Sequence, residues 1–149
     1  MKKFHAGILA AGLAGVMLLC GCETSKSYTF TVSTGDDIEV KLDTTNGLDL
    51  KQEDGTFAVT DKDGNYILQS AWYQAEIFDQ YKEQLADAEG TENIEMTDDM
   101  IVWDFVSDGS PAEHDRICRL SDKTAVLIGS QADKDTADAA FDALTLTIE

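Results

Sequence analysis

Three short stretches of the chain bring together side chains of the kinds that bind metals or attack substrates. Cys20 and Cys22 stand two positions apart in the stretch LLCGCET, a spacing that suits a metal clip or a redox couple. His114 and Cys118 are four positions apart, and an imidazole beside a thiol is how a cysteine nucleophile is activated. The stretch DKDGN, residues 61–65, begins in the way that calcium-binding loops begin. Which of these patterns can do chemistry depends on the elements that carry them.

The start of the chain has the proportions of a secretory signal peptide. Lys2 and Lys3 form a short positive region, and the segment 6–19 carries no charge. This segment is shorter than the run of about 20 residues that a membrane-spanning helix needs. It also has no polar face, so a buried amphipathic helix is excluded.

The residues that end this segment, Leu19-Cys20-Gly21-Cys22, resemble the lipobox of bacterial lipoproteins. In that family a small residue precedes the cysteine that becomes the mature N-terminus, and Gly21 and Cys22 meet this pattern. The resemblance implies cleavage between Gly21 and Cys22, which removes residues 1–21, and a diacylglyceryl group on the Cys22 thiol. Cys20 is not the lipidated residue, because Leu19 would then occupy the position that needs a small side chain. An ordinary signal peptide or an uncleaved anchor is the alternative.

A lipidated Cys22 would hold the protein at the extracytoplasmic face of the cell membrane. Two or more acyl chains bind a bilayer essentially permanently, whereas one chain binds only marginally. Residues 22–27 would then form the lipidated end and a short tether, and residues 28–149 a single folded domain. Monoderm and diderm hosts stay open as alternatives, because their lipoproteins share the same box.

The composition is strongly acidic, with 29 Asp and Glu against 11 Lys and Arg and a net charge of −18. Such a surface repels phosphate backbones and anionic headgroups, so nucleic acid is excluded as a partner and the lipid is the predicted membrane contact. The many aromatic and branched apolar residues exclude a disordered acidic tail.

Alternation of apolar and polar residues predicts short antiparallel strands at the start of the domain. Tyr28, Phe30 and Val32 alternate with polar residues, and the dipeptides Asn46-Gly47 and Asp63-Gly64 mark tight turns. Further strands are predicted at residues 101–106, 113–120, 124–129 and 144–148.

Two helices are predicted between these strands. The first has Ser70 as its N-cap, continues to about residue 87, and ends before Gly90. The second begins at a capping box, residues 130–133. Its apolar stripe consists of Ala137, Ala140, Phe141 and Leu144.

These elements predict a single α+β domain, a bent antiparallel sheet with two helices packed on it. The order of elements is similar to that of the Mog1/PsbP-like fold of small exported proteins. The resemblance implies this fold and no particular activity.

The predicted elements argue against catalysis at the candidate stretches. In DKDGN, the twelfth position of a calcium loop falls on Trp72 instead of a glutamate, and Gly64 comes too early, so a hairpin turn is expected. On a strand, His114 and Cys118 lie about 13 Å apart, too far for a hydrogen bond. We therefore expect a surface histidine and a half-buried free thiol.

Four aromatic residues and two arginines complete the candidates. The aromatic residues are predicted to lie in the core rather than to form a sugar-stacking platform: Trp72, Tyr73, Trp103 and Phe105. Alternation places Arg116 on the face of His114 and Cys118, and Arg119 on the opposite face. Both arginines are expected to form cross-strand ion pairs with neighbouring carboxylates.

The sequence therefore predicts a membrane-anchored lipoprotein whose domain is a non-catalytic binding or interaction module. We expect no catalytic residue, no metal and no cofactor, and an unidentified envelope protein as the partner. A lipoprotein that captures a small solute or a divalent cation is the alternative, and a hydrolase that uses scattered acids or Cys118 is a third. A cleft with converging polar groups would favour a ligand, and a flat apolar patch would favour a protein.

Overall fold

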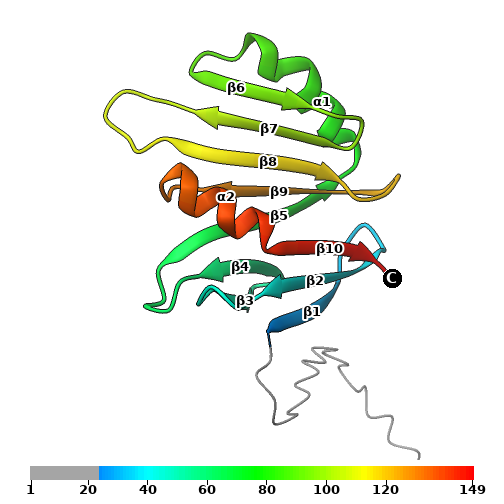
Figure 1. Ribbon diagram of the computed structural model, residues 1–149. Coiled ribbons are helices and arrows are strands. Elements are labelled where there is room, and N and C mark those ends of the chain that lie inside the picture. The colour runs from blue at the N-terminus through cyan, green and yellow to red at the C-terminus, as the bar shows by residue number, and fades with distance from the viewer. Residues whose placement is uncertain (1–23) are drawn as a thin grey trace, which may run out of the picture.

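The computed structural model describes residues 24–149. The predicted signal peptide, the cleavage site at Gly21 and the lipidation residue Cys22 lie outside the described residues. In the part described, ten strands, two α-helices and one 3₁₀ helix follow one another (Figure 1). Their bounds are β1 (Ser25–Thr31), β2 (Asp37–Asp43), β3 (Asp49–Glu53), β4 (Thr56–Thr60), β5 (Tyr66–Gln74), α1 (Glu76–Gln84), η1 (Leu85–Asp87), β6 (Thr91–Met96), β7 (Met100–Phe105), β8 (Glu113–Arg119), β9 (Thr124–Ser130), α2 (Lys134–Asp142) and β10 (Leu144–Ile148).

The strands form two antiparallel sheets, which confirms the α+β class. The smaller sheet has the order β1-β2-β10 and the larger β3-β4-β5-β9-β8-β7-β6. The prediction of a single bent sheet is therefore wrong. The chain leaves the first sheet after β2, through the turn at Gly47, and returns to it only with β10, whose Leu146 pairs with Val40.

The main core lies between the two sheets and continues beneath α2. Figure 1 shows β10 and α2 side by side in front of the larger sheet, so they cover part of the same face. Phe30 of the smaller sheet places its ring 6.2 Å from that of Phe57 and 5.7 Å from that of Trp72 in the larger sheet. The fully buried members include Ile38, Val40, Leu42, Leu50, Val59, Leu68 and Val126.

A second core lies under α1, on the opposite face of the larger sheet. It consists of Phe78, Leu85, Ile101, Trp103, Ile117 and Ala125. Trp103 is buried there against Tyr81, with 5.3 Å between ring centroids, and Phe105 packs at its edge. The prediction of core aromatics holds for these residues and for Trp72, but Tyr73 is exposed.

The first helix starts later than predicted. Ser70 is not its N-cap but lies within β5, where its hydroxyl accepts a hydrogen bond from the Phe57 amide and donates one to the Phe57 carbonyl. β5 occupies a central place between β4 and β9, and pairing on both sides extends it to Gln74. Tertiary pairing therefore overrides the local helical pattern.

The second helix is capped by Asp133 rather than by Ser130. The Asp133 carboxylate accepts the Thr136 amide at 3.0 Å, while Ser130 ends β9. Ala137, Ala140 and Phe141 are buried as predicted, whereas Leu144 already belongs to β10. The edge strand β6 was not predicted, because only two of its residues, Ile94 and Met96, are apolar.

Gly90 sets the direction of the chain into β6. Its φ is +84°, and a Cβ at this position would lie 2.6 Å from the carbonyl oxygen of Val106. Only glycine combines this left-handed conformation with so close an approach of two backbone segments.

Candidate functional site

A buried histidine–aspartate pair lies on the α2 side of the larger sheet. His114 of β8 stands directly opposite Asp104 of β7, and its Nδ1 is 2.6 Å from Asp104 Oδ1. Asn93 donates a hydrogen bond to Asp104 Oδ2 at 2.7 Å. The prediction of a surface histidine is wrong, since only 9% of His114 is exposed. Spacing within one strand could not show that an aspartate stands opposite it on the next.

Ser130 of β9 stands opposite His114 on the side away from Asp104. Ser130, His114 and Asp104 therefore have the residue types of a hydrolytic triad. Asp104 keeps its charge there: burial would raise its pKa, but the hydrogen bonds from His114 and Asn93 outweigh burial and lower it. The Ser130 hydroxyl, however, accepts the Ala132 amide at 3.2 Å and is 4% exposed. Among the described residues no hydrogen bond joins Ser130 to His114. We therefore interpret Asp104, His114 and Ser130 as structural residues.

Cys118 does not act with His114. The two residues have different neighbours on the adjacent strands: Cys118 pairs with Met100 and Val126, and His114 pairs with Asp104 and Ser130. Burial raises the pKa of the Cys118 thiol to about 11, although the nearby Arg116 opposes the rise. A thiol with so high a pKa is a poor nucleophile. The prediction of a half-buried free thiol is confirmed.

A groove of about 560 Å³ runs between α2 and the outer strands of the larger sheet. On the sheet side it is lined by residues of β6, β7 and β8, and on the helix side by one face of α2. We call it the α2 groove. Its lining residues are Asn93, Glu95, Met100, Val102, Asp104, Arg116, Lys134, Asp138 and Asp142.

Arg116 is the one lining side chain of the α2 groove with a buried donor that lacks an acceptor. Its guanidinium carbon lies 4.1 Å from the centroid of the Phe141 ring, so the group is stacked in place. Its Nη2 is 3.8 Å from Asp138 Oδ1, beyond hydrogen-bond distance, and its Nε is buried without a partner. Among the described residues, the Arg116 side chain makes no hydrogen bond.

Arg119, on the opposite face of β8, also has a buried Nε without a partner in the described part of the chain, but its Nη2 is held by close contacts. Its Nη2 lies 2.6 Å from Asp79 Oδ2 and 3.5 Å from the Ala75 carbonyl oxygen. Alternation thus placed the two arginines on the correct faces. The expected cross-strand ion pairs are wrong, because Asp79 and Asp138 belong to the helices that cover those faces.

The charges of the α2 groove are mixed. Its acids outnumber its two bases, Arg116 and Lys134. Two of the acids are already engaged: Asp104 bonds His114, and Asp138 lies 3.2 Å from the ammonium of Lys134. The other two, Glu95 and Asp142, form no hydrogen bond or ion pair within residues 24–149.

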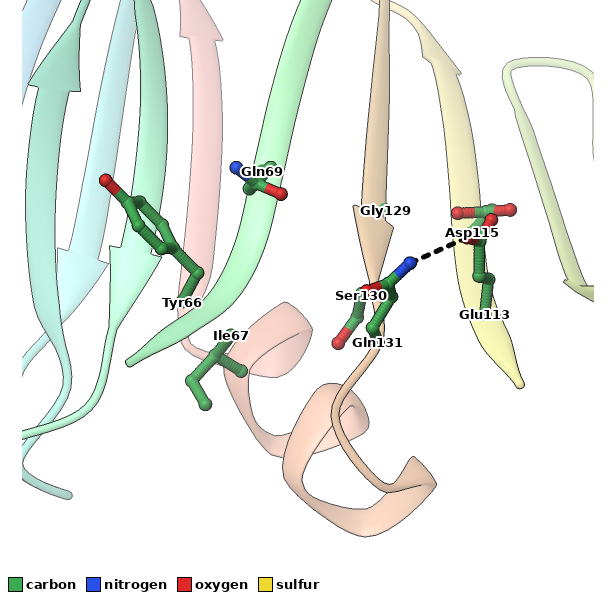
Figure 2. A pocket seen from close by; sticks show the side chains of 8 residues that line it. All are labelled: Tyr66, Ile67, Gln69, Glu113, Asp115, Gly129, Ser130 and Gln131. Atoms are coloured by element: carbon green, nitrogen blue, oxygen red, sulfur yellow. Dashed lines mark hydrogen bonds between the residues drawn. The ribbon is translucent and has the colours of Figure 1, made fainter. Parts of the chain in front are cut away.

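A smaller hollow of about 290 Å³ lies on the α1 side of the larger sheet, near the ends of β5, β8 and β9 (Figure 2). Asp115 lies over Gly129, where a Cβ would come within 2.7 Å of the Asp115 Oδ1. Burial, reinforced by the charge of Glu113, raises the pKa of Asp115 to about 6. Gln131 donates to Glu113 at 2.9 Å, whereas no side chain of the described part bonds Asp115.

The DKDGN stretch is a turn, as predicted. Asp61 Oδ1 accepts the amides of Asp63 at 2.8 Å and Asn65 at 2.9 Å, and Gly64 has a φ of +83°. Within residues 24–149 no group of three or more His, Cys, Asp or Glu is placed to hold a metal ion. In the same range, no helix is long and apolar enough to cross a membrane.

Comparison with protein-family models, with curated proteins and with solved structures finds no match to this chain. The α2 groove and the Asp115 hollow therefore rest on the geometry alone. The sequence singled out Arg116 but not its lack of acceptors, and it placed Asp115 on the face opposite His114 without giving it a role. The only sequence signal for the groove was the alternation that places Arg116 on the α2 side of β8.

Proposed function

We propose that this protein is a membrane-anchored extracytoplasmic lipoprotein whose α+β domain is a non-catalytic binding module, and that the α2 groove is its binding site. The lipobox-like sequence ending at Cys22 supports the anchor. The first strand begins at Ser25, so only Glu23 and Thr24 separate the predicted lipid from the domain. Such a short tether keeps the domain at the membrane surface.

The observation that carries the binding function is the Arg116 guanidinium without hydrogen bonds. A buried donor without an acceptor costs about 1–3 kcal/mol, and more when it is charged. The described residues hold two other such groups, the Thr60 hydroxyl and Arg119 Nε, but neither lines the α2 groove. Arg116 lies in a groove of about 560 Å³, a volume within the usual range for small-molecule sites. Catalysis is disfavoured by the high pKa of Cys118 and by the engaged hydroxyl of Ser130.

The surface favours a small ligand over a large protein partner. Within residues 24–149, the exposed large hydrophobic residues are Tyr66, Tyr73, Met96, Val106 and Ile148. They come from β5, β6, the loop after β7 and β10, and the two on β5 lie at opposite ends of that strand. A protein-binding patch would gather such residues on neighbouring positions.

The anchor is tested by the intact mass of the protein extracted with detergent from its native membrane. We expect a mass that begins at Cys22 and carries the lipid. A Cys22→Ala variant should lose the lipid, whereas Cys20→Ala, the matched control, should keep it. Retention of residues 1–21, or an unmodified Cys22, would contradict the anchor.

The binding site is tested by thermal unfolding of the full chain in the presence of a library of small solutes. At least one chemical class should raise the melting temperature of the wild type and not that of Arg116→Gln, because ligand binding stabilises the folded state. If no class does so, the proposed binding function is wrong.

A further inference from the structure

We infer that the α2 groove binds a small zwitterion, a free amino acid, with the ligand carboxylate on Arg116 and the ligand ammonium on the acidic wall that contains Glu95. This inference rests on the proposed binding function and adds the chemical class of the ligand. Three observations support it: the Arg116 Nε lacks an acceptor, acidic residues outnumber basic ones in the groove, and the register of β6, β7 and β8 aligns the charges.

Arg116 requires a planar acceptor. The guanidinium is stacked on Phe141 and its Nε is buried without a partner. Asp138 does not serve as that acceptor, since it stands 3.8 Å from Nη2 and is turned to Lys134. A carboxylate matches the fork of a guanidinium with two parallel hydrogen bonds, and these are among the strongest in proteins.

The surrounding charge excludes a simple anion. Four carboxylates, those of Glu95, Asp104, Asp138 and Asp142, face two cationic side chains, those of Arg116 and Lys134. The protein as a whole carries a net charge of −18, so a free anion would be repelled as it approached. A simple cation would be attracted, but it would leave the Arg116 guanidinium without a hydrogen-bond acceptor. A zwitterion satisfies both groups without adding net charge.

The strand register places an acid, an apolar floor and a base in one row. Glu95 of β6 stands opposite Val102 of β7, and Val102 stands opposite Arg116 of β8. Two strand spacings separate Glu95 from Arg116, about 10 Å between backbones. The ammonium and carboxylate of an amino acid fit between two such side chains, and the apolar Val102 and Met100 form the floor on which its side chain would lie.

Glu95 is available for an ammonium, because it makes no hydrogen bond or ion pair within the described part of the chain. Asp142, at the end of α2, is free in the same sense and lines the same groove. The other two carboxylates are held by His114 and Lys134. The groove therefore presents one base, Arg116, whose Nε has no acceptor, and two acids without a partner among the described residues.

The test is isothermal titration calorimetry of the detergent-solubilised full chain with three matched probes. L-leucine carries both charges, L-leucine methyl ester lacks the carboxylate, and N-acetyl-L-leucine lacks the ammonium. We expect L-leucine to bind with a millimolar or lower dissociation constant, and each single-charge analogue to bind at least about tenfold more weakly. Equal binding of the methyl ester would show a plain cation site and overturn the inference, as would the absence of L-leucine binding.

Four variants locate the site. Arg116→Gln and Glu95→Gln should each weaken L-leucine binding by about tenfold or more. Arg119→Gln removes an arginine from the opposite face, and Glu92→Gln removes an acid from β6 outside the groove lining, so both controls should bind as the wild type does. Unchanged binding by either groove variant would overturn the assignment. Glu95 is exposed on an edge strand, so its replacement should not disturb folding, and its variant remains informative if Arg116→Gln fails to fold.

The outcomes separate this inference from the function on which it rests. If a different class of solute stabilises the wild type and not Arg116→Gln, the binding module stands and the amino-acid assignment is wrong. If nothing stabilises the wild type in an Arg116-dependent way, both are wrong.

Discussion

Replacing Asp115 by asparagine should make the protein more stable at neutral pH. The carboxyl group of Asp115 is partly buried over Gly129, beside the like charge of Glu113. Tyr81 of α1 lies close enough to interact with this charge: its pKa is raised chiefly by burial and also by Tyr73 and Asp115. No cation offsets the Asp115 charge by an ion pair in residues 24–149. An asparagine keeps the shape of the side chain and removes the charge.

The sign and size follow from the pKa. The pKa of Asp115 rises from 3.8 to about 6 on folding, so the folded state disfavours the charged form. A rise of this size corresponds to at most about 3 kcal/mol, and screening of the partly exposed group reduces it to about 1–2 kcal/mol. This loss is absent at low pH, where the group is neutral in both states. It develops as the pH rises from about 4 through about 6.

The assay is urea unfolding of wild type and Asp115→Asn at several pH values between about 4 and 7.5. The variant should be more stable by about 1–2 kcal/mol at the upper end of this range, and the difference should vanish at the lower end. Asp122→Asn, at an exposed position, is the matched control and should show no such pH-dependent gain. A difference that does not depend on pH, or a less stable Asp115→Asn at neutral pH, would refute the reasoning.

Two further predictions concern the buried network and the free thiol. His114→Gln should lower the free energy of unfolding by about 3 kcal/mol at neutral pH in urea titrations, because it leaves the Asp104 carboxylate buried without its partner. Since the pKa of Asp104 is lowered in the fold, this loss should shrink as the pH falls through that pKa, and a loss below about 1 kcal/mol at neutral pH would contradict a structural pair. Cys118, with a pKa of about 11 against an ordinary 9.0, should react with a thiol reagent at pH 8 about 100-fold more slowly in the folded protein than in the urea-unfolded chain, as followed by absorbance. Equal rates would show that the thiol is neither buried nor raised in pKa.

Local patterns predicted most of the strands and the tight turns of the first hairpins. Gly47 and Gly64 adopt the positive φ that their dipeptides indicated, because the turn residues themselves set this geometry. The limits of α1 and the strand β6 were not predictable in this way. Ser70 belongs to a strand because β4 and β9 pair on its two sides, and β6 exists because it pairs with β7.

The candidate site depends on pairing between strands distant in the sequence. Alternation along β8 correctly placed Arg116 beside His114, but the partner Asp104 and the row from Glu95 through Val102 follow only from the registers of β6, β7 and β8. The same holds for Asp115, whose raised pKa arises from burial against Gly129 on the next strand. One-dimensional patterns identify which face a residue occupies, and they do not identify its neighbours across the sheet.

The most direct test of the α2 groove as the binding site is the NMR signal of the Arg116 Nε–H group in the isotope-labelled full chain. The signal is assigned by its loss in Arg116→Lys. On addition of L-leucine, we predict a saturable shift of the Arg116 signal while the Arg119 signal stays in place. An Arg116 signal that does not move while L-leucine binds would contradict the central claim that this guanidinium holds the ligand.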